Sequence, residues 1–88
     1  LNLITFFTAT GTNVVHAWTL RQGETAYEAA GKVHTDMQRG FIRAEVIEWE
    51  QLLELGSWNA ARDVGKLRLE GKDYIASDGD VMEFRFNV

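Results

Sequence analysis

The sequence predicts a single small domain of the α+β class, in which strands and helices occupy different stretches of the chain. Runs of β-branched and aromatic residues near both ends indicate strands, and a helix-capping signal followed by a stripe of small apolar residues lies between them. The 88 residues are 45% hydrophobic and include three tryptophans, which is enough for one core. A domain of this size buries only about two-thirds of its unfolded surface, so one modest core is the limit.

The first predicted element is a β-hairpin. Residues 3–10 and 14–21 are rich in strand-forming side chains. Between them, Gly11-Thr12-Asn13 supplies two residue types that tolerate the positive φ angles of tight turns. The two strands are therefore expected to pair directly.

A helix is predicted to follow Gly23. Thr25 and Glu28 have the spacing of a capping box, in which the threonine side chain accepts from the N3 amide and the glutamate reaches back to the cap. The small apolar residues then recur with helical spacing, which suits close packing on a sheet. They are Ala26, Ala29, Ala30 and Val33.

The middle of the chain predicts a third strand followed by two minor helices. Residues 41–47 alternate, and the side carrying Ile42, Ala44 and Val46 is expected to face the helix. Trp49, Leu52 and Leu53 show helical spacing in a segment that Gly56 ends, and Ser57 is expected to cap a short helix over residues 58–64.

The last quarter predicts three more strands. They cover residues 66–70, 73–76 and 81–88, and Asp78-Gly79-Asp80 before the last one is a turn signal. In the final strand, alternation places one set of side chains toward the core. This set is Met82, Phe84, Phe86 and Val88.

The apolar character of the first strand raises the possibility of an interface. Its two faces carry Leu3 and Phe7 on one side and Ile4 and Phe6 on the other, and Trp18 is expected nearby. The face that does not cover the helix would leave large apolar groups in water unless a partner covers it. The alternative is that an aromatic side chain is tucked under the segment 49–64.

Charge and composition exclude several classes of function. The net charge of −4 argues against autonomous, tight nucleic-acid binding and gives no expectation of DNA specificity. The absence of cysteine removes disulfides and thiol chemistry, and no apolar run approaches the roughly 18 residues of a membrane span. The basic residues are unevenly spread, so a local contact patch competes with a plain solvated face. The candidates for RNA, ribosome or partner contact are Arg39, Arg43, Lys66, Arg68 and Lys72.

Two Gly-Lys pairs resemble the end of the phosphate-binding P-loop, G-x-x-x-x-G-K-[ST], but lack its other residues. Before Gly65-Lys66, Ala60 stands at the first glycine position and Leu67 at the hydroxyl position. The pair at residues 71–72 fails at the same two positions. Nucleotide hydrolysis by this segment is therefore not expected, and no cofactor or metal is assigned to it.

One small polar cluster could in principle support acid–base chemistry. His34, Asp36 and Arg39 lie close together in the sequence, but two potential ligands do not make a metal site. The simpler interpretation is structural: His34 closes the preceding helix, and Thr35 or Asp36 caps the following turn.

The stretch 34–46 has the character of a family signature, led by His34, Thr35, Asp36, Gly40 and Phe41. Together with residues 3–8 and 67–88, it closely resembles the C-terminal TGS domain of the YchF, or Obg-like, ATPase family of P-loop proteins. The resemblance covers essentially the whole chain. It narrows the expected fold to a ubiquitin-like β-grasp, a mixed sheet wrapped over one main helix.

The resemblance implies a non-catalytic interaction module, residues 1–88, at the C-terminal end of a larger cytoplasmic nucleotide-binding protein. ATP or GTP with magnesium would bind a separate P-loop domain. The module would contact that domain and other domains, and would help contact the ribosome or RNA. A start on Leu1-Asn2-Leu3, without an initiator methionine, fits a piece of a longer protein.

Two alternatives remain open at this point. One is a free-standing ubiquitin-like protein-binding domain, although a carrier needs an exposed C-terminal Gly-Gly and residues 84–88 are Phe-Arg-Phe-Asn-Val. The other is a small enzyme that uses His34, Asp36 and Arg39.

Overall fold

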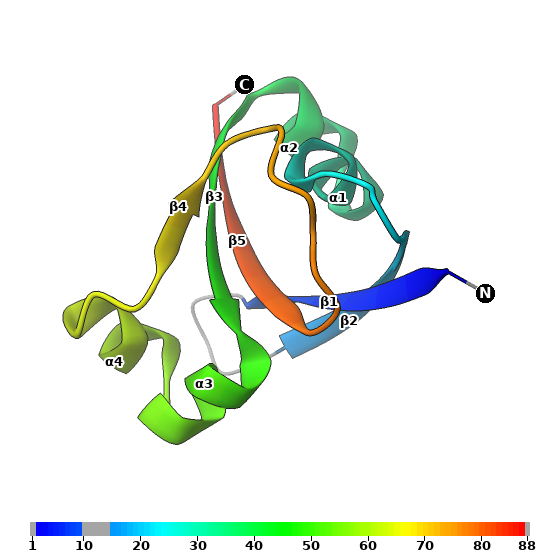
Figure 1. The fold of residues 1–88 in the computed structure, drawn as a ribbon. Helices are drawn as coiled ribbons and strands as arrows, with labels where there is room; N and C mark the ends of the chain where they lie inside the picture. Colours follow the sequence, from blue (N-terminus) through cyan, green and yellow to red (C-terminus); the bar gives the residue numbers. More distant parts are fainter. Residues whose placement is uncertain (1, 10–14, 88) are drawn as a thin grey trace.

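The computed structural model describes residues 2–9 and 15–87, which form a five-stranded sheet with helices on both sides (Figure 1). The strands are β1 (Leu3–Ala9), β2 (Val15–Arg21), β3 (Phe41–Glu48), β4 (Arg68–Glu70) and β5 (Asp80–Phe86). Their order is β2-β1-β5-β3-β4; β1 and β5 are parallel and every other pair is antiparallel. This mixed sheet over a main helix is the β-grasp arrangement, so the predicted fold class is confirmed.

The predicted hairpin is present. β1 and β2 pair in register from Leu3 opposite Arg21 to Ala9 opposite Val15. The predicted turn at 11–13 lies outside the described residues, as do the expected strand positions Thr10, Val14 and Val88.

Helix α1 (Ala26–Val33) begins at the predicted capping box. The Thr25 hydroxyl oxygen accepts from the Glu28 amide at 3.4 Å, and Glu28 Oε1 accepts from the Thr25 amide at 3.1 Å. Ala26, Ala29 and Ala30 are fully buried against the sheet. Their small side chains let the helix backbone approach the strands closely.

The inner face of the sheet, which α1 covers, differs from the prediction in β3. A bulge between Phe41 and Arg43 adds one residue to that strand. Phe41 is therefore buried with Ala44 and Val46, while Ile42 is 55% exposed. The expectation that Ile42 faces the helix is wrong because simple alternation cannot anticipate the bulge.

The inward face of the last strand is also shorter than predicted. Met82 and Phe84 belong to the core under α1, but Phe86 is 38% exposed. Phe86 pairs with Phe41 at the end of the sheet. The prediction that Phe86 is buried beneath the alanine stripe is therefore wrong.

The segment 71–79 is a loop, so the strand predicted at 73–76 is wrong. Its backbone bonds go to the start of α1 instead of to a sheet neighbour. The Ala26 amide donates to the Tyr74 carbonyl at 2.8 Å, and the Ala76 amide donates to the Glu24 carbonyl at 3.0 Å. Ile75 makes only an isolated bridge with Thr25.

The outer face of the sheet is covered at one end by α3 (Trp49–Leu55) and α4 (Trp58–Asp63) (Figure 1). As predicted, Gly56 ends α3 in the left-handed conformation, φ 92°, and the Ser57 hydroxyl caps α4 by accepting from the Ala60 amide at 3.0 Å. A second apolar cluster forms there. It consists of Ile47, Ala61 and Val81, with Phe7, Ala9, Leu52, Leu55, Trp58 and Leu67 packed against them.

This second cluster decides the question raised by the apolar first strand. Phe7 is covered by the 49–64 segment, which was the alternative to an interface, while Leu3 at the other end of β1 remains exposed. Within residues 2–9 and 15–87, no helix has the length and apolar character needed to cross a membrane.

Candidate functional site

The signature stretch is a structural junction between α1, α2 (Thr35–Arg39) and β3. His34 closes the first helix, because its amide donates to the Ala30 carbonyl at 3.0 Å. It also caps the second, because its Nδ1 accepts from the Asp36 amide at 3.0 Å. The cap expected from Thr35 or Asp36 is therefore supplied by His34.

The cluster of His34, Asp36 and Arg39 serves these helix ends. Arg39 Nη2 lies 2.8 Å from Asp36 Oδ1, and all three side chains are substantially exposed. His34 Nδ1 is bonded to the Asp36 amide and Asp36 Oδ1 to Arg39, so these polar groups are bonded to one another. Across the described part of the chain, no group of three or more histidine, aspartate or glutamate side chains could hold a metal ion.

Gly40 and Phe41 complete the junction. A Cβ on Gly40 would collide with the backbone carbonyl of Asn87, whose amide donates to the Gly40 carbonyl at 2.9 Å. The Phe41 ring packs 6.2 Å from Phe84 and 6.4 Å from Tyr27, measured between ring centroids. These signature residues hold the last strand against the helices.

The five predicted contact cations do not form one patch. Lys66 follows α4, which packs on the outer face of the sheet, whereas the Lys72 amine lies 5.4 Å from the ring centre of Tyr27 on α1, which covers the inner face. Arg43 lies on the outer face, and Arg68 pairs with Val46, which points inward. Their contribution to binding remains a prediction, but they cannot act as a single surface.

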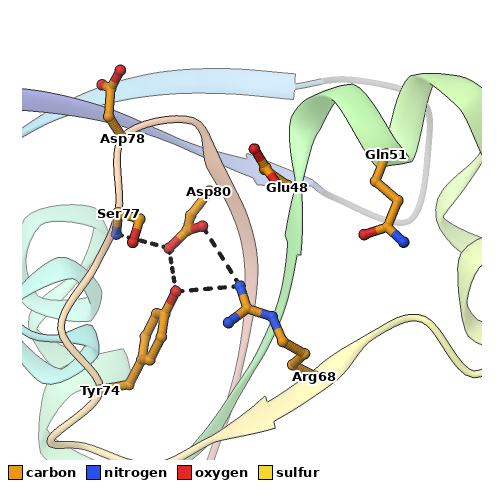
Figure 2. A pocket seen from close by; sticks show the side chains of 7 residues that line it. All are labelled: Glu48, Gln51, Arg68, Tyr74, Ser77, Asp78 and Asp80. Atoms are coloured by element: carbon orange, nitrogen blue, oxygen red, sulfur yellow. Dashed lines mark hydrogen bonds and ion pairs between the residues drawn. The ribbon is translucent and has the colours of Figure 1, made fainter.

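Arg68 belongs to a compact polar site at the start of β5 (Figure 2). Asp80, almost fully buried, accepts from the Tyr74 hydroxyl at 2.7 Å and from the Ser77 amide at 2.9 Å. Arg68 Nη2 donates to the Tyr74 hydroxyl oxygen at 3.3 Å and lies 3.7 Å from Asp80 Oδ1. Arg68 Nη1 also donates to Glu70 at 3.4 Å.

The pKa shifts at this site follow from burial and the buried carboxylate. Burial raises the pKa of Tyr74, and the hydrogen bond to Asp80 raises it further. Burial acts to lower the pKa of Arg68, but the hydrogen bond with Tyr74 and the nearby Asp80 and Glu70 outweigh it, so that pKa is raised. The site keeps a neutral phenol and a charged guanidinium locked together.

A pocket of about 320 Å³ opens beside this site. It is lined by Glu48, Gln51, Arg68, Tyr74, Ser77, Asp78 and Asp80. Three carboxylates against one guanidinium suit a cationic or hydrogen-bond-donating group better than a phosphate. The Asp80 carboxylate is already satisfied, so its main role is to anchor the 71–79 loop and Arg68.

A second polar cluster, missed by the sequence interpretation, lies on the outer face and is called the arginine face below. It consists of Arg43 and Glu45 on β3, Glu83 and Arg85 on β5, and Arg62 on α4. Glu45, with a side chain 8% exposed, lies 3.3 Å from Arg62, 3.5 Å from Arg85 and 3.8 Å from Arg43. Glu83 lies 3.0 Å from Arg85 and 3.8 Å from Arg62.

The sequence did carry a signal for this cluster. Arg43-x-Glu45 and Glu83-x-Arg85 are mirror-image patterns in two alternating segments. If the two segments pair antiparallel with their centres aligned, such patterns put like charges opposite and unlike charges on the diagonals. The observed register does so, with Arg43 opposite Arg85 and Glu45 opposite Glu83.

The chain matches known proteins over its whole length. Residues 3–87 match the family YchF-GTPase_C, described as "Protein of unknown function (DUF933)". The chain is 58% identical over 88 residues to the ribosome-binding ATPase YchF of Haemophilus influenzae, and 52% identical over 88 residues to the human Obg-like ATPase 1. These matches cover 100% of this chain but only 24% and 22% of those proteins.

Solved structures agree with the sequence matches. The Schizosaccharomyces pombe YchF GTPase superposes with a TM-score of 0.84 at 37% identity, covering 96% of this chain and 22% of that one. A GTP-binding protein from Pyrococcus horikoshii gives a TM-score of 0.66 at 27% identity, covering 97% of this chain and 21% of that one. The chain therefore belongs to the YchF-GTPase_C family, the TGS-like C-terminal domain of the YchF and Obg-like ATPases.

Proposed function

We propose that this chain is a non-catalytic interaction domain of a ribosome-binding ATPase. The main support is that the matched relatives are about four times as long as this chain. Relatives named as ribosome-binding ATPases match the whole chain, yet the chain spans about a quarter of their length and contains no P-loop sequence. Nucleotide binding then belongs to the remaining three-quarters, with ATP or GTP and magnesium bound there.

The polar clusters support a role in contact and not in catalysis. His34, Asp36 and Arg39 are used in helix capping, and Asp80 is used to anchor a loop. The residues 1–88 act as one domain that docks on its neighbouring domains and on the ribosome or its RNA. A cytoplasmic location follows from that partner.

Phosphate contact is assigned to Arg39, Arg43, Lys66, Arg68 and Lys72, as the sequence suggested. The structure supplies a reason to rank them. Arg39 and Arg68 lie against carboxylates at 2.8 Å and 3.4 Å, whereas the only carboxylate paired with Arg43 is 3.8 Å away among the described residues. Cations with weaker internal partners lose less when they turn to a phosphate.

Equilibrium titration of the 88-residue chain with labelled ATP and GTP tests the non-catalytic part. We expect no saturable binding, because no backbone loop of the P-loop type is encoded. Micromolar binding of either nucleotide, retained after removal of contaminating ATPases, would contradict it.

Co-sedimentation of the chain with purified ribosomes over a salt series tests the contact part. We expect binding that weakens with salt, with a log–log slope of roughly 0.7 to 0.9 per phosphate contact. The double variant Lys66→Glu, Lys72→Glu should reduce that slope; Arg68 is left intact because a carboxylate there would face buried Asp80. Absence of sedimentation at low salt would refute ribosome contact by this domain.

A further inference from the structure

We propose that the arginine face binds the sugar-phosphate backbone of RNA, so that Arg62 and Arg85 join Arg43 as contact residues. This inference rests on the proposed function, which it narrows to one surface and one chemical class of partner. Three arginines against two glutamates leave one net positive charge, on a chain whose net charge is −4.

The exposure of the charged groups favours an anionic partner. The side chains of Glu45 and Glu83 are only 8% and 21% exposed. Those of Arg43, Arg62 and Arg85 are 46%, 45% and 43% exposed. Each guanidinium has five N–H donors, more than its contacts with Glu45 and Glu83 consume. A ligand arriving at this face therefore meets arginine donors first.

The positions of the arginines are fixed before any ligand arrives. Arg43 and Arg85 stand directly opposite one another on neighbouring strands, an arrangement of like charges that is unfavourable without an intervening anion. The Glu45 carboxylate supplies part of that negative charge. It also pairs with Arg62 on α4, whose Nη2 lies 3.3 Å from Glu45 Oε1. Because the fold already brings the three side chains together, binding a ligand at this face needs less rearrangement.

Phosphate is the anion that best fits three neighbouring guanidinium groups. The planar fork of arginine pairs with phosphate oxygens in bidentate fashion. Leu69, opposite Glu45 on the edge strand β4 and 65% exposed, offers an apolar neighbour for a ribose or base. An acidic protein surface would use the same donors, and the experiment separates the two partners.

The network could instead serve only to clamp α4 onto the sheet. The two roles predict opposite effects for Glu83→Gln. If the network only clamps α4, the substitution removes one partner of Arg62 and Arg85 and RNA binding does not improve. If the face binds RNA, the substitution raises its net positive charge and RNA binding becomes tighter. We expect RNA affinity to rise about fivefold at low salt, the effect of one charge about 4 Å from a phosphate in water.

The experiment measures binding of the 88-residue chain to protein-free ribosomal RNA and to intact ribosomes over a salt series, with folding checked by circular dichroism. Arg43→Gln, Arg85→Gln should lower the salt slope by about 1.4 to 1.8, the loss of two phosphate contacts. Arg43→Gln alone, which disturbs the network least, should lower it by about 0.7 to 0.9. The control is the double variant Arg21→Gln, Lys32→Gln, which removes the same amount of positive charge from β2 and α1. It should bind RNA more tightly than the double variant of Arg43 and Arg85.

The outcomes separate the two proposals. Failure of the unmodified chain to bind ribosomes would remove the proposed function itself. Binding to ribosomes without binding to protein-free RNA would assign the face to an acidic ribosomal protein and overturn this inference. Equal binding by the folded Arg43, Arg85 variant and its charge-matched control, or no gain with Glu83→Gln, would also overturn it.

Discussion

The two faces of the sheet are built on different principles. The inner face is apolar where α1 covers it, and three fully buried alanines let α1 pack against the cluster that holds Phe6 and Met82. Toward β4, this face instead carries a polar site, that of Arg68 and Asp80. The outer face is apolar only at the end covered by α3 and α4, and elsewhere it carries the arginine face. Over residues 43–46 and 82–85, β3 and β5 present apolar side chains to the inner side and charged side chains to the outer side.

This contrast separates stability from contact. Burial of apolar area on the inner face is the dominant favourable contribution to folding. The ion pairs on the outer face join buried Glu45 to half-exposed arginines, so solvent screens them in part and they should contribute less to stability than the apolar core does. The proposed RNA contact would give the exposed arginines of the outer face a role apart from folding.

Phe84→Ala should be the most damaging change and should expose the difference between neighbouring positions of one strand. Phe84 is 8% exposed in the inner core, so we expect a loss of about 3 to 5 kcal/mol in the free energy of unfolding. Phe86→Ala, at a position 38% exposed, should cost about 1 kcal/mol. Urea denaturation measures both, and equal costs would show that the strand end is buried differently.

Glu45→Gln tests how much the outer network contributes to folding. The change removes the buried negative charge shared by Arg43, Arg62 and Arg85, and we expect a loss of about 1.5 to 3 kcal/mol. Glu50→Gln, on the exposed surface of α3, is the matched control and should stay within about 0.5 kcal/mol. A cost comparable to that of Phe84→Ala would mean that the outer face is as important to stability as the inner core.

Gly40→Ala tests the signature junction, where the last strand meets α2. The new methyl group would meet the Asn87 backbone, which cannot retreat like a flexible side chain, so we expect a loss of about 1 to 3 kcal/mol. Gly71→Ala, where a Cβ meets no atom within 4 Å, is the control. Thermal unfolding of both variants should rank them in that order; a neutral Gly40→Ala would place the chain end elsewhere.

Tyr74→Phe should cost about 1 to 3 kcal/mol at neutral pH, because it removes two hydrogen bonds, one donated to Asp80 and one accepted from Arg68, each worth about 0.5 to 1.5 kcal/mol. Its pH dependence is the sharper test. Burial raises the pKa of Tyr74 above its unfolded value, so the folded state holds its proton more tightly. The stability that this provides is present below the unfolded pKa, near 10, and is lost as pH rises through the folded pKa. Unfolding curves from pH 8 to 11 should fall less steeply for Tyr74→Phe than for the unmodified chain.

Local signals predicted much of the fold. The capping box at Thr25, the glycine end of α3 and the serine cap of α4 act within a few residues, so their sequence patterns were sufficient. Alternation could not predict that Ile42 and Phe86 are exposed. Ile42 lies at a bulge and Phe86 at the end of the sheet, and both features depend on how β3 and β5 pair.

The candidate site was harder to predict for the same reason. Proximity in the sequence grouped Lys66, Arg68 and Lys72, but a strand and a loop carry them to different sides. The arginine face joins β3, α4 and β5, which only the sheet register brings together. Buried Asp80 was interpreted as turn chemistry, because nothing local showed that Tyr74 would bond to it.

The most direct test of the division between faces is nuclear magnetic resonance of the arginine side chains. The Nε–Hε signals of the 88-residue chain would be followed while a short single-stranded RNA is added at low salt. We predict that Arg43, Arg62 and Arg85 shift together and saturably, because they lie side by side on one face, while Arg39 and Arg68, which lie outside the arginine face, shift little. Shifts confined to Arg39 and Arg68, or no saturable shift of the three outer arginines, would contradict the account.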